Sequence, residues 1–265
     1  MDTCHMPTLG DAVSGFYIDV LGRFQAARIS FLIGGSFALA RYTTIDRDTK
    51  DIDIFLRASD MPAAMALLEQ AGYRTEVPFP HWLAKVHANG SFIDLIFSSG
   101  NGVARVDDLW FEHAVEHEVL GMRVRLCPPE EMVWSKAFIQ ERERFDGADV
   151  MHLLRELGPR LDWPHLLARF GDHWPVLFSH IVMFRYIYPD RRDRVPAWVV
   201  DELTRRLPTV QPEPDRHICN GTLLSREQYL ADIERHGYQD ARLVPHGAMT
   251  PVETEIWTAA IADKK

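Results

Sequence analysis

The residues with the clearest chemical potential lie between Phe31 and Phe55, in the segment FLIGGSFALARYTTIDRDTKDIDIF. Its last five residues, DIDIF, alternate carboxylates with apolar side chains. Because successive side chains of a β-strand point to opposite faces, Asp51 and Asp53 are expected on one strand face. Two like charges on one face repel each other. The usual reason for such a pair is a divalent cation, which prefers oxygen ligands.

A glycine turn precedes these aspartates, where an apolar run ends in Gly34-Gly35-Ser36. Glycine lets a backbone approach a phosphate closely, and the free N–H groups at the start of a helix attract anions. Ser36 is also a favoured residue for capping a helix. The turn therefore predicts a phosphate-binding strand-to-helix junction, with a plain turn as the alternative. It is not a Walker A loop, because no G-K-[ST] follows.

A third carboxylate, Asp94, lies within the apolar segment FIDLIF. A charge in so apolar a strand is costly unless it faces a metal or a partner. Asn89-Gly90 is the preferred pair for a type I′ hairpin turn, and counting outward from it sets Lys85 opposite Asp94. The alternatives stay open: Asp94 simply pairs with Lys85, Asp51 pairs with Lys50 or Arg47 in a solvated turn, and Asp53 is an exposed strand residue.

The elements that would position these residues follow from periodicity and turn signals. Apolar residues at helical spacing predict a helix over 10–27, and Asp60 is expected to cap another that ends at Gly72. The expected strands are 28–33, 51–56, 73–77, 81–88, 91–97 and a pair over 119–126 that turns at Gly121. The expected helices after Pro128-Pro129 are 130–142, 146–157, 162–171, 173–187, 196–207 and 225–236, the last with Ser225 and Gln228 as a capping box.

Composition describes an ordinary globular chain of 265 residues, 46% of them hydrophobic and 25% charged. The net charge of −9 argues against a long nucleic-acid groove, which is usually basic. The three cysteines lie far apart, which argues against a disulfide framework or a zinc ribbon and suggests a reducing, cytoplasmic setting. The sequence shows no signal peptide and no membrane-spanning run.

Together, the apolar strand, the G-G-S turn, the D-x-D pair and the later Asp94 resemble the nucleotidyltransferase superfamily with a DNA polymerase β-like core. The resemblance covers roughly residues 10–126 and extends to small bacterial uncharacterised and toxin–antitoxin-type members. It implies an α+β fold: a catalytic core over 1–128 with a mixed sheet, a helical region over 129–210, and a C-terminal extension over 211–265.

The resemblance also implies the chemistry. Asp51, Asp53 and Asp94 would hold two Mg²⁺ ions, with Mn²⁺ as the alternative, and Asp94 would take the proton of the acceptor hydroxyl. Gly34, Gly35 and Ser36 would contact the phosphates of an NTP such as ATP, and pyrophosphate would leave. Lys85, Lys50, Arg47 and Arg41 are candidate cations for the transition-state charge, in that order, and for Arg41 and Arg47 a solvated surface is the favoured alternative.

A second motif follows the proline boundary, where Glu130-Glu131 precedes Lys136 and then Arg144, Asp146 and Asp149. Many small bacterial members carry a similar run, with an R-x-D-x-x-D-like end, although the spacing here departs from the usual form. The resemblance implies that Lys136 lies near the nucleotide phosphates, with an exposed helix lysine as the alternative. Asp149 is expected to cap or brace the helix pair instead of binding a ligand. The helical His152, His165, His173 and His180 have no metal-ligand spacing, so we read them as structural or surface residues.

The predicted function is transfer of a nucleoside monophosphate to a hydroxyl of a small molecule, an RNA 3′ end or a protein. The negative charge favours a small or cationic acceptor. The alternative is a toxin–antitoxin or regulatory protein that binds a toxin or antitoxin partner and has little or no catalysis.

Overall fold

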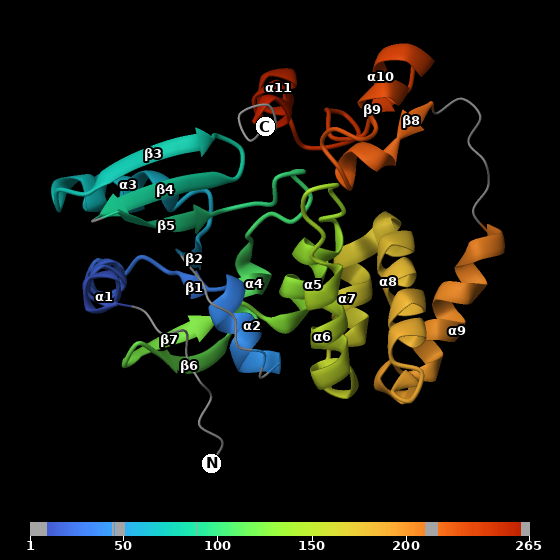
Figure 1. The fold of residues 1–265 in the computed structure, drawn as a ribbon, viewed down its shortest axis with the longest axis horizontal. Coiled ribbons are helices and arrows are strands. Elements are labelled where there is room, and N and C mark those ends of the chain that lie inside the picture. Colours follow the sequence, from blue (N-terminus) through green and yellow to red (C-terminus); the bar gives the residue numbers. More distant parts are fainter. Residues whose placement is uncertain (1–9, 44, 46–50, 89, 210–216, 261–265) are drawn as a thin grey trace. The chain divides into compact units, whose positions relative to one another are not determined.

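The computed structural model describes residues 10–43, 45, 51–88, 90–209 and 217–260. The chain divides into two compact units, Met1–Pro128 and Pro129–Lys265. Figure 1 labels their helices and strands. Within the described ranges, no helix combines the length and the apolar character needed to cross a membrane.

A mixed sheet of seven strands forms the centre of the first unit. The strands are β1 (Leu32–Ile33), β2 (Asp51–Phe55), β3 (Arg74–Phe79), β4 (Leu83–Ala88), β5 (Ser91–Ile96), β6 (Val115–Val119) and β7 (Met122–Leu126). Their order in the sheet is β3-β4-β5-β2-β1-β7-β6. β2 pairs with β5 and β1 with β7 in parallel, and the other neighbours are antiparallel. The prediction of a mixed sheet followed by a mostly helical region is confirmed.

The apolar face of this sheet forms much of the core. Ile52, Ile54, Ile93 and Leu95 are fully buried, as the period-two pattern predicts. The helices of this unit are α1 (Asp11–Ala26), α2 (Gly35–Thr43), α3 (Met61–Gln70) and α4 (Asp108–Glu112). The predicted apolar stripe of α1 is buried from Phe16 to Phe24, and α2 packs against β2. The aspartates therefore lie on the face of β2 opposite to Ile52 and Ile54.

Three local predictions for the first unit were wrong in detail. The strand predicted from Arg28 begins at Leu32, because Ala27 and Arg28 form the turn that closes α1 and the N–H of Ile29 donates to the carbonyl of Phe24. The strand pair expected from 119 begins at Val115. Asp60 precedes α3 but makes no capping bond, and its carboxylate instead lies 3.7 Å from Nη1 of Arg57.

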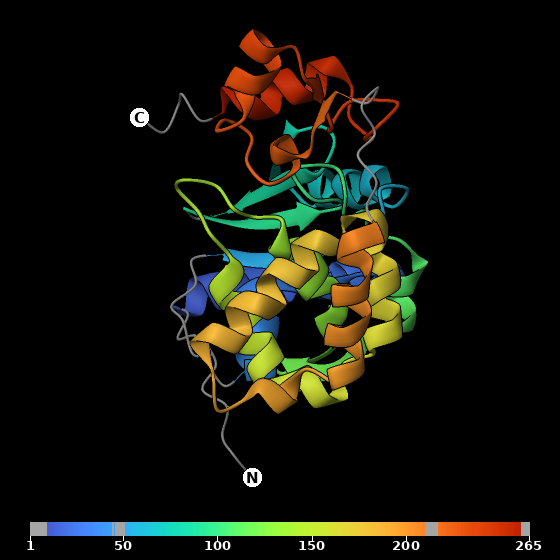
Figure 2. The ribbon, with the colours of Figure 1, turned by 90° about the vertical axis from the view of Figure 1, so that its right-hand side faces the viewer.

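Helices dominate the second unit. They are α5 (Pro129–Ala137), α6 (Gly147–Leu157), α7 (Trp163–Phe170), α8 (Trp174–Ile187), α9 (Ala197–Arg206), α10 (Leu230–His236) and α11 (Pro251–Ala259). β8 (Ile218–Cys219) and β9 (Gln239–Asp240) form a short parallel ladder. In both views α8 and α9 lie side by side (Figure 1, Figure 2).

Two helix boundaries in this unit differ from the prediction. The helix expected to reach 142 ends at Ala137, because the chain turns back on itself and Gln140 pairs with Phe145 in an antiparallel bridge. The helix expected from Ser225 begins at Leu230. The Ser225 hydroxyl does accept the N–H of Gln228, at 3.3 Å, but this bond closes a turn ahead of the helix.

Candidate active site

The glycine turn joins β1 to α2 and packs directly against β2. The N–H of Gly34 donates to the carbonyl of Asp53 at 2.9 Å. Gly35 is the first residue of α2 and has φ +54°, a left-handed conformation that favours glycine. A Cβ at position 35 would lie 1.6 Å from Oδ2 of Asp53, and one at position 34 would lie 2.3 Å from the ring of Phe55. Both glycines are therefore needed for the close approach.

Ser36 lies one position inside α2, so the helix begins one residue earlier than its expected cap. The backbone N–H groups of the first turn of a helix have no partner within the helix, and this turn starts beside a carboxylate. The junction thus has the backbone that an anion-binding turn needs, next to a group that would itself repel an anion unless a cation lies between them.

The three predicted carboxylates share one face of the sheet. Asp51 and Asp53 are half-buried on β2, and the parallel register pairs Asp53 with Asp94 and Asp51 with Phe92 on β5. Paired residues on adjacent strands point to the same side. The structure therefore brings Asp51 and Asp53 together with Asp94, which lies 41 positions after Asp53 in the chain.

Lys85 is bound to the third carboxylate. The register predicted from the hairpin is confirmed, since Ala88 pairs with Ser91 and Lys85 with Asp94. Nζ of Lys85 lies 2.5 Å from Oδ1 of Asp94, and the two side chains are 23% and 15% exposed. Burial raises the pKa of Asp94; the hydrogen bond and charge of Lys85 oppose this rise without cancelling it, and Asp51 adds to it.

Tyr17 of α1 is a neighbour that the sequence did not single out. Its side chain is fully buried, and its hydroxyl donates to the carbonyl of Phe92 at 3.4 Å. Burial, followed by the charges of Asp51, Asp53 and Asp94, raises the pKa of Tyr17 to about 12. As one apolar position in a helical stripe, it carried no signal of this role. After burial, the negative potential of the three aspartates accounts for the rest of this rise in pKa.

That potential and the all-oxygen donor set fit a hard divalent cation. Among the described residues, no three His, Cys, Asp or Glu side chains converge into a complete metal centre. This agrees with the usual mode of Mg²⁺ binding, in which one or two carboxylates act together with substrate phosphates instead of an all-protein cage. The residues present therefore fit the ion as a partner of a phosphate substrate.

The structure provides less information on the other candidate cations for the transition-state charge. Arg41, in the last turn of α2, is exposed, in agreement with the solvated reading. Arg47 and Lys50 lie outside the described residues, as does Asn89 of the hairpin turn.

Lys136 belongs to the second unit, where it links α5 to α6. Its Nζ lies 3.0 Å from Asp146 and 2.8 Å from Asp149, and the side chain is 15% exposed. The alternative of an exposed helix lysine is therefore wrong, and Asp149 braces the helix pair. Burial lowers the pKa of Lys136, but the two aspartates outweigh it, so that the pKa is raised. A phosphate contact of Lys136 stays a prediction.

Two helical histidines are structural, as predicted. Nε2 of His165 lies 2.7 Å from the buried carboxylate of Glu131, and Nε2 of His180 donates to the carbonyl of Ala137 at 2.8 Å. Burial lowers the pKa of His180. Both therefore hold α5 to the helices that follow it.

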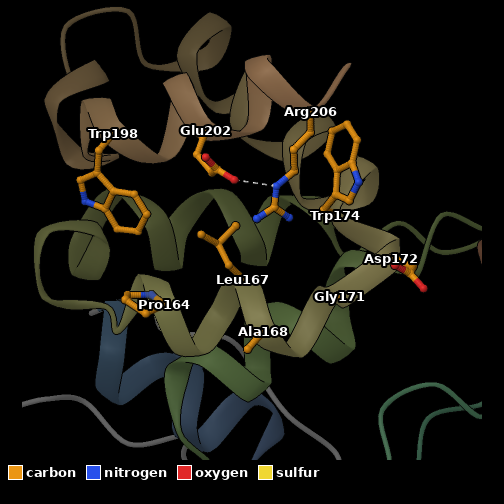
Figure 3. A pocket seen from close by; sticks show the side chains of 9 residues that line it. All are labelled: Pro164, Leu167, Ala168, Gly171, Asp172, Trp174, Trp198, Glu202 and Arg206. Atoms are coloured by element: carbon orange, nitrogen blue, oxygen red, sulfur yellow. Dashed lines mark hydrogen bonds and ion pairs between the residues drawn. The ribbon is translucent and has the colours of Figure 1, made fainter. Parts of the chain in front are cut away.

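The second unit also contains an open cavity of about 730 Å³ between α7 and α9 (Figure 3). Leu167 lines it from α7, Trp174 from the start of α8, and Trp198, Glu202 and Arg206 from α9. Nε of Arg206 donates to Glu202 at 3.0 Å, one turn earlier in α9. None of the site residues predicted from the sequence lines this cavity, so it adds nothing to the acidic face of the sheet.

Comparison with protein families matches residues 18–173 to the family described as "uncharacterised nucleotidyltransferase". No curated protein matches the chain significantly. The lincomycin-bound lincosamide antibiotic adenylyltransferase LnuA is 18% identical, with 53% of this chain and 94% of that chain covered at a TM-score of 0.38. The antibiotic-resistance factor ANT(2″)-Ia is 15% identical, with 76% and 94% covered at 0.40. An antigenic nucleotidyltransferase-like protein from Paracoccidioides brasiliensis is 15% identical, with 66% and 94% covered at 0.37.

Proposed function

Because the chain belongs to this family of nucleotidyltransferases, we propose that it transfers a nucleoside monophosphate from an NTP to a hydroxyl acceptor and releases pyrophosphate. One observation carries the proposal: Asp53 and Asp94 are paired on adjacent parallel strands, with the backbone of Gly35 packed against Asp53. This arrangement places the glycine turn beside acidic residues that share one face, which supports a turn that binds phosphate next to a metal site.

The three aspartates divide the work. Asp51, Asp53 and Asp94 would hold Mg²⁺, which would neutralise charge on the triphosphate and acidify the acceptor hydroxyl. Asp94 accepts the proton of that hydroxyl. The acceptor oxygen then bonds to the α-phosphorus as the bond from that phosphorus to the bridging oxygen of the β-phosphate breaks, and pyrophosphate leaves. The raised pKa of Asp94 suits a group that gains a proton in the reaction.

The glycine turn and Lys85 act on the phosphates. N–H groups of Gly35 and Ser36 at the start of α2 donate to the phosphate oxygens, and the helix dipole adds to their attraction. Lys85 lies beside Asp94 and can offset the charge that develops on the leaving oxygens. Gly35→Ala would disturb the glycine turn, because the added Cβ would take the place of the Asp53 carboxylate.

The acceptor we propose is a small molecule with hydroxyl groups, cationic in preference to anionic. The net charge of −9 disfavours a long nucleic acid, whose binding depends on many Lys and Arg contacts to phosphate. It does not distinguish one small acceptor from another.

Label transfer tests this function. The full chain is incubated with each α-³²P-labelled NTP and Mg²⁺ in the presence of a small-molecule extract, total RNA or protein. We expect label in the small-molecule fraction, equimolar pyrophosphate, and loss of both in Asp53→Asn. Asp60→Asn is the matched control, because Asp60 lies in the same unit and its carboxylate lies 3.7 Å from Nη1 of Arg57. Transfer that survives in Asp53→Asn contradicts the mechanism. Thermal stabilisation by an NTP without any transfer favours the regulatory binding protein.

A further inference from the structure

A four-residue charge ladder crosses the sheet at the candidate site. The registers pair Asp53 with Asp94, Asp94 with Lys85 and Lys85 with Glu76, from β2 through β5 and β4 to β3. Residues paired in this way lie on one face, with Cβ atoms about 5 Å apart across each antiparallel pair. Across the sheet, the ladder therefore consists of two carboxylates, then one ammonium, then a further carboxylate.

Lys85 makes two contacts in this ladder. Its Nζ lies 2.5 Å from Oδ1 of Asp94, and it lies 4.0 Å from the centroid of the Phe92 ring, two residues before Asp94 on the same strand face. The ring holds the ammonium by a cation–π contact that does not use the carboxylate. Lys85 would therefore keep one partner if Asp94 turned to another cation.

A divalent ion bound to Asp94 would lie close to the Lys85 ammonium, which contacts Oδ1 of this carboxylate at 2.5 Å. Two cations this close repel each other. Glu76, opposite Lys85 on β3, is a further carboxylate on the far side from Asp94, and it pairs with His87 at 3.0 Å and with Arg74 at 3.6 Å. Lys85 therefore has a carboxylate position on each side in the ladder, and its own contact at 2.5 Å is with Asp94.

We propose that Lys85 competes with the divalent cation for Asp94, so that binding of the ion displaces the lysine ammonium from this carboxylate. The inference rests on the proposed metal site and adds a second role for Lys85 besides phosphate binding. Lys85 is here a positioning residue: it keeps Asp94 charged and oriented, and it gives up that contact when the ion takes its place.

Direct measurement of Mn²⁺ binding tests the competition without nucleotide or activity. Free Mn²⁺ is followed by its electron paramagnetic resonance signal during titration of the full chain at constant pH. Lys85→Met should bind Mn²⁺ about tenfold more tightly than the wild type, because an adjacent opposite charge shifts ionic equilibria at a carboxylate by one to three powers of ten. Lys85→Arg should resemble the wild type.

Two controls separate competition from general electrostatics. Arg74→Met removes a cation from the same sheet face. Arg74 pairs with His87, which pairs with Phe92, which in turn pairs with Asp51. Its side chain is 68% exposed and touches Glu76 and not Asp94, so Mn²⁺ affinity should change less than about twofold. In an Asp94→Asn background, Lys85→Met should no longer tighten binding.

Thermal unfolding in EDTA gives a second readout. Lys85→Met should lower the midpoint, because it leaves the buried Asp94 charge without a partner, and the double variant with Asp94→Asn should recover it. Equal Mn²⁺ affinity of wild type and Lys85→Met, or an equal gain in Arg74→Met, overturns the competition and leaves the proposed function standing. Absence of Mn²⁺ binding in the wild type and in Lys85→Met, both alone and with a non-hydrolysable NTP analogue present, overturns the metal site, and the competition with it.

Discussion

Gly35 and Asp53 approach so closely that only a hydrogen fits between the Gly35 Cα and the aspartate side chain. A Cβ on residue 35 would lie 1.6 Å from Oδ2 of Asp53, and the φ of +54° adds strain for any other residue. We therefore expect Gly35→Ala to displace Asp53 and to lower the rate of nucleotidyl transfer at least about 100-fold, the scale of a 1 Å misplacement in an active site.

Gly22→Ala is the matched control for this substitution. Gly22 lies inside α1, and a Cβ there meets no atom within 4 Å. Alanine should raise the free energy of unfolding by up to about 1 kcal/mol and leave transfer unchanged. Full transfer activity in Gly35→Ala, measured beside this control, would contradict the role of the close contact.

Asp94→Asn should remove activity at little cost in stability. The folded pKa of Asp94 is raised, mainly by burial, so its ionised form disfavours folding at pH values above that pKa. Asparagine removes this charge, and Lys85, which is 23% exposed, can reach water. Urea unfolding at pH 7 should show a free energy equal to or above that of the wild type. A loss of several kcal/mol would show that the ion pair outweighs the burial of Asp94.

Asp146 should make stability fall at low pH. Burial by itself raises its pKa, but hydrogen bonds from Arg144 and the charges of Lys136 and Arg144 lower it from 3.8 to about 2. Because the folded pKa is depressed, its contribution is complete above pH 3.8 and is lost as the pH falls towards 2. The shift corresponds to about 2 kcal/mol at neutral pH.

Urea unfolding from pH 7 to pH 2, followed by tryptophan fluorescence, checks this. Asp146→Asn should cost about 2 kcal/mol at pH 7, and its difference from the wild type should shrink below pH 4. The exposed neighbour Glu143 offers a control, since Glu143→Gln should change little at either pH. If the difference in free energy of unfolding between Asp146→Asn and the wild type did not depend on pH, the contribution of Asp146 would come from packing and not from its charge.

Tyr17 should report the charge of the aspartates. Its pKa of about 12 is raised by burial and by Asp51, Asp53 and Asp94. Less negative charge nearby favours the phenolate, so Asp53→Asn or a bound divalent ion should lower this pKa. The pKa is measured from the ¹³Cζ resonance of labelled tyrosine during a pH titration, and the Tyr17→Phe variant identifies which resonance belongs to Tyr17. A pKa that does not respond to Asp53→Asn would mean that burial alone sets it.

Local patterns in the sequence were sufficient to predict most of the residues on the acidic face of the sheet. Alternation placed Asp51 and Asp53 opposite Ile52 and Ile54, and the hairpin count paired Lys85 with Asp94. Both depend on residues close in the chain. The parallel pairing of Asp53 with Asp94 depends on the order of strands in the sheet, and the motif order of the family supplied it.

Two contacts could not be predicted from local signals, because tertiary packing creates them. Lys136 has the sequence of an exposed helix lysine, and only the return of α6 encloses it between Asp146 and Asp149. Tyr17 is spaced like any core residue of α1, yet its hydroxyl reaches the carbonyl of Phe92. Spacing along one element cannot reveal which distant element supplies the partner.

The register of β5 has a consequence for how this chain tolerates insertions and deletions. Asp94 faces the other aspartates only because it pairs with Asp53, while its neighbours Ile93 and Leu95 are buried on the other side. Loss of one codon between Gly90 and Asp94 would turn every following side chain of the strand over, burying the carboxylate and exposing leucine. Reading-frame-preserving deletions should therefore be far less tolerated here than in a surface loop.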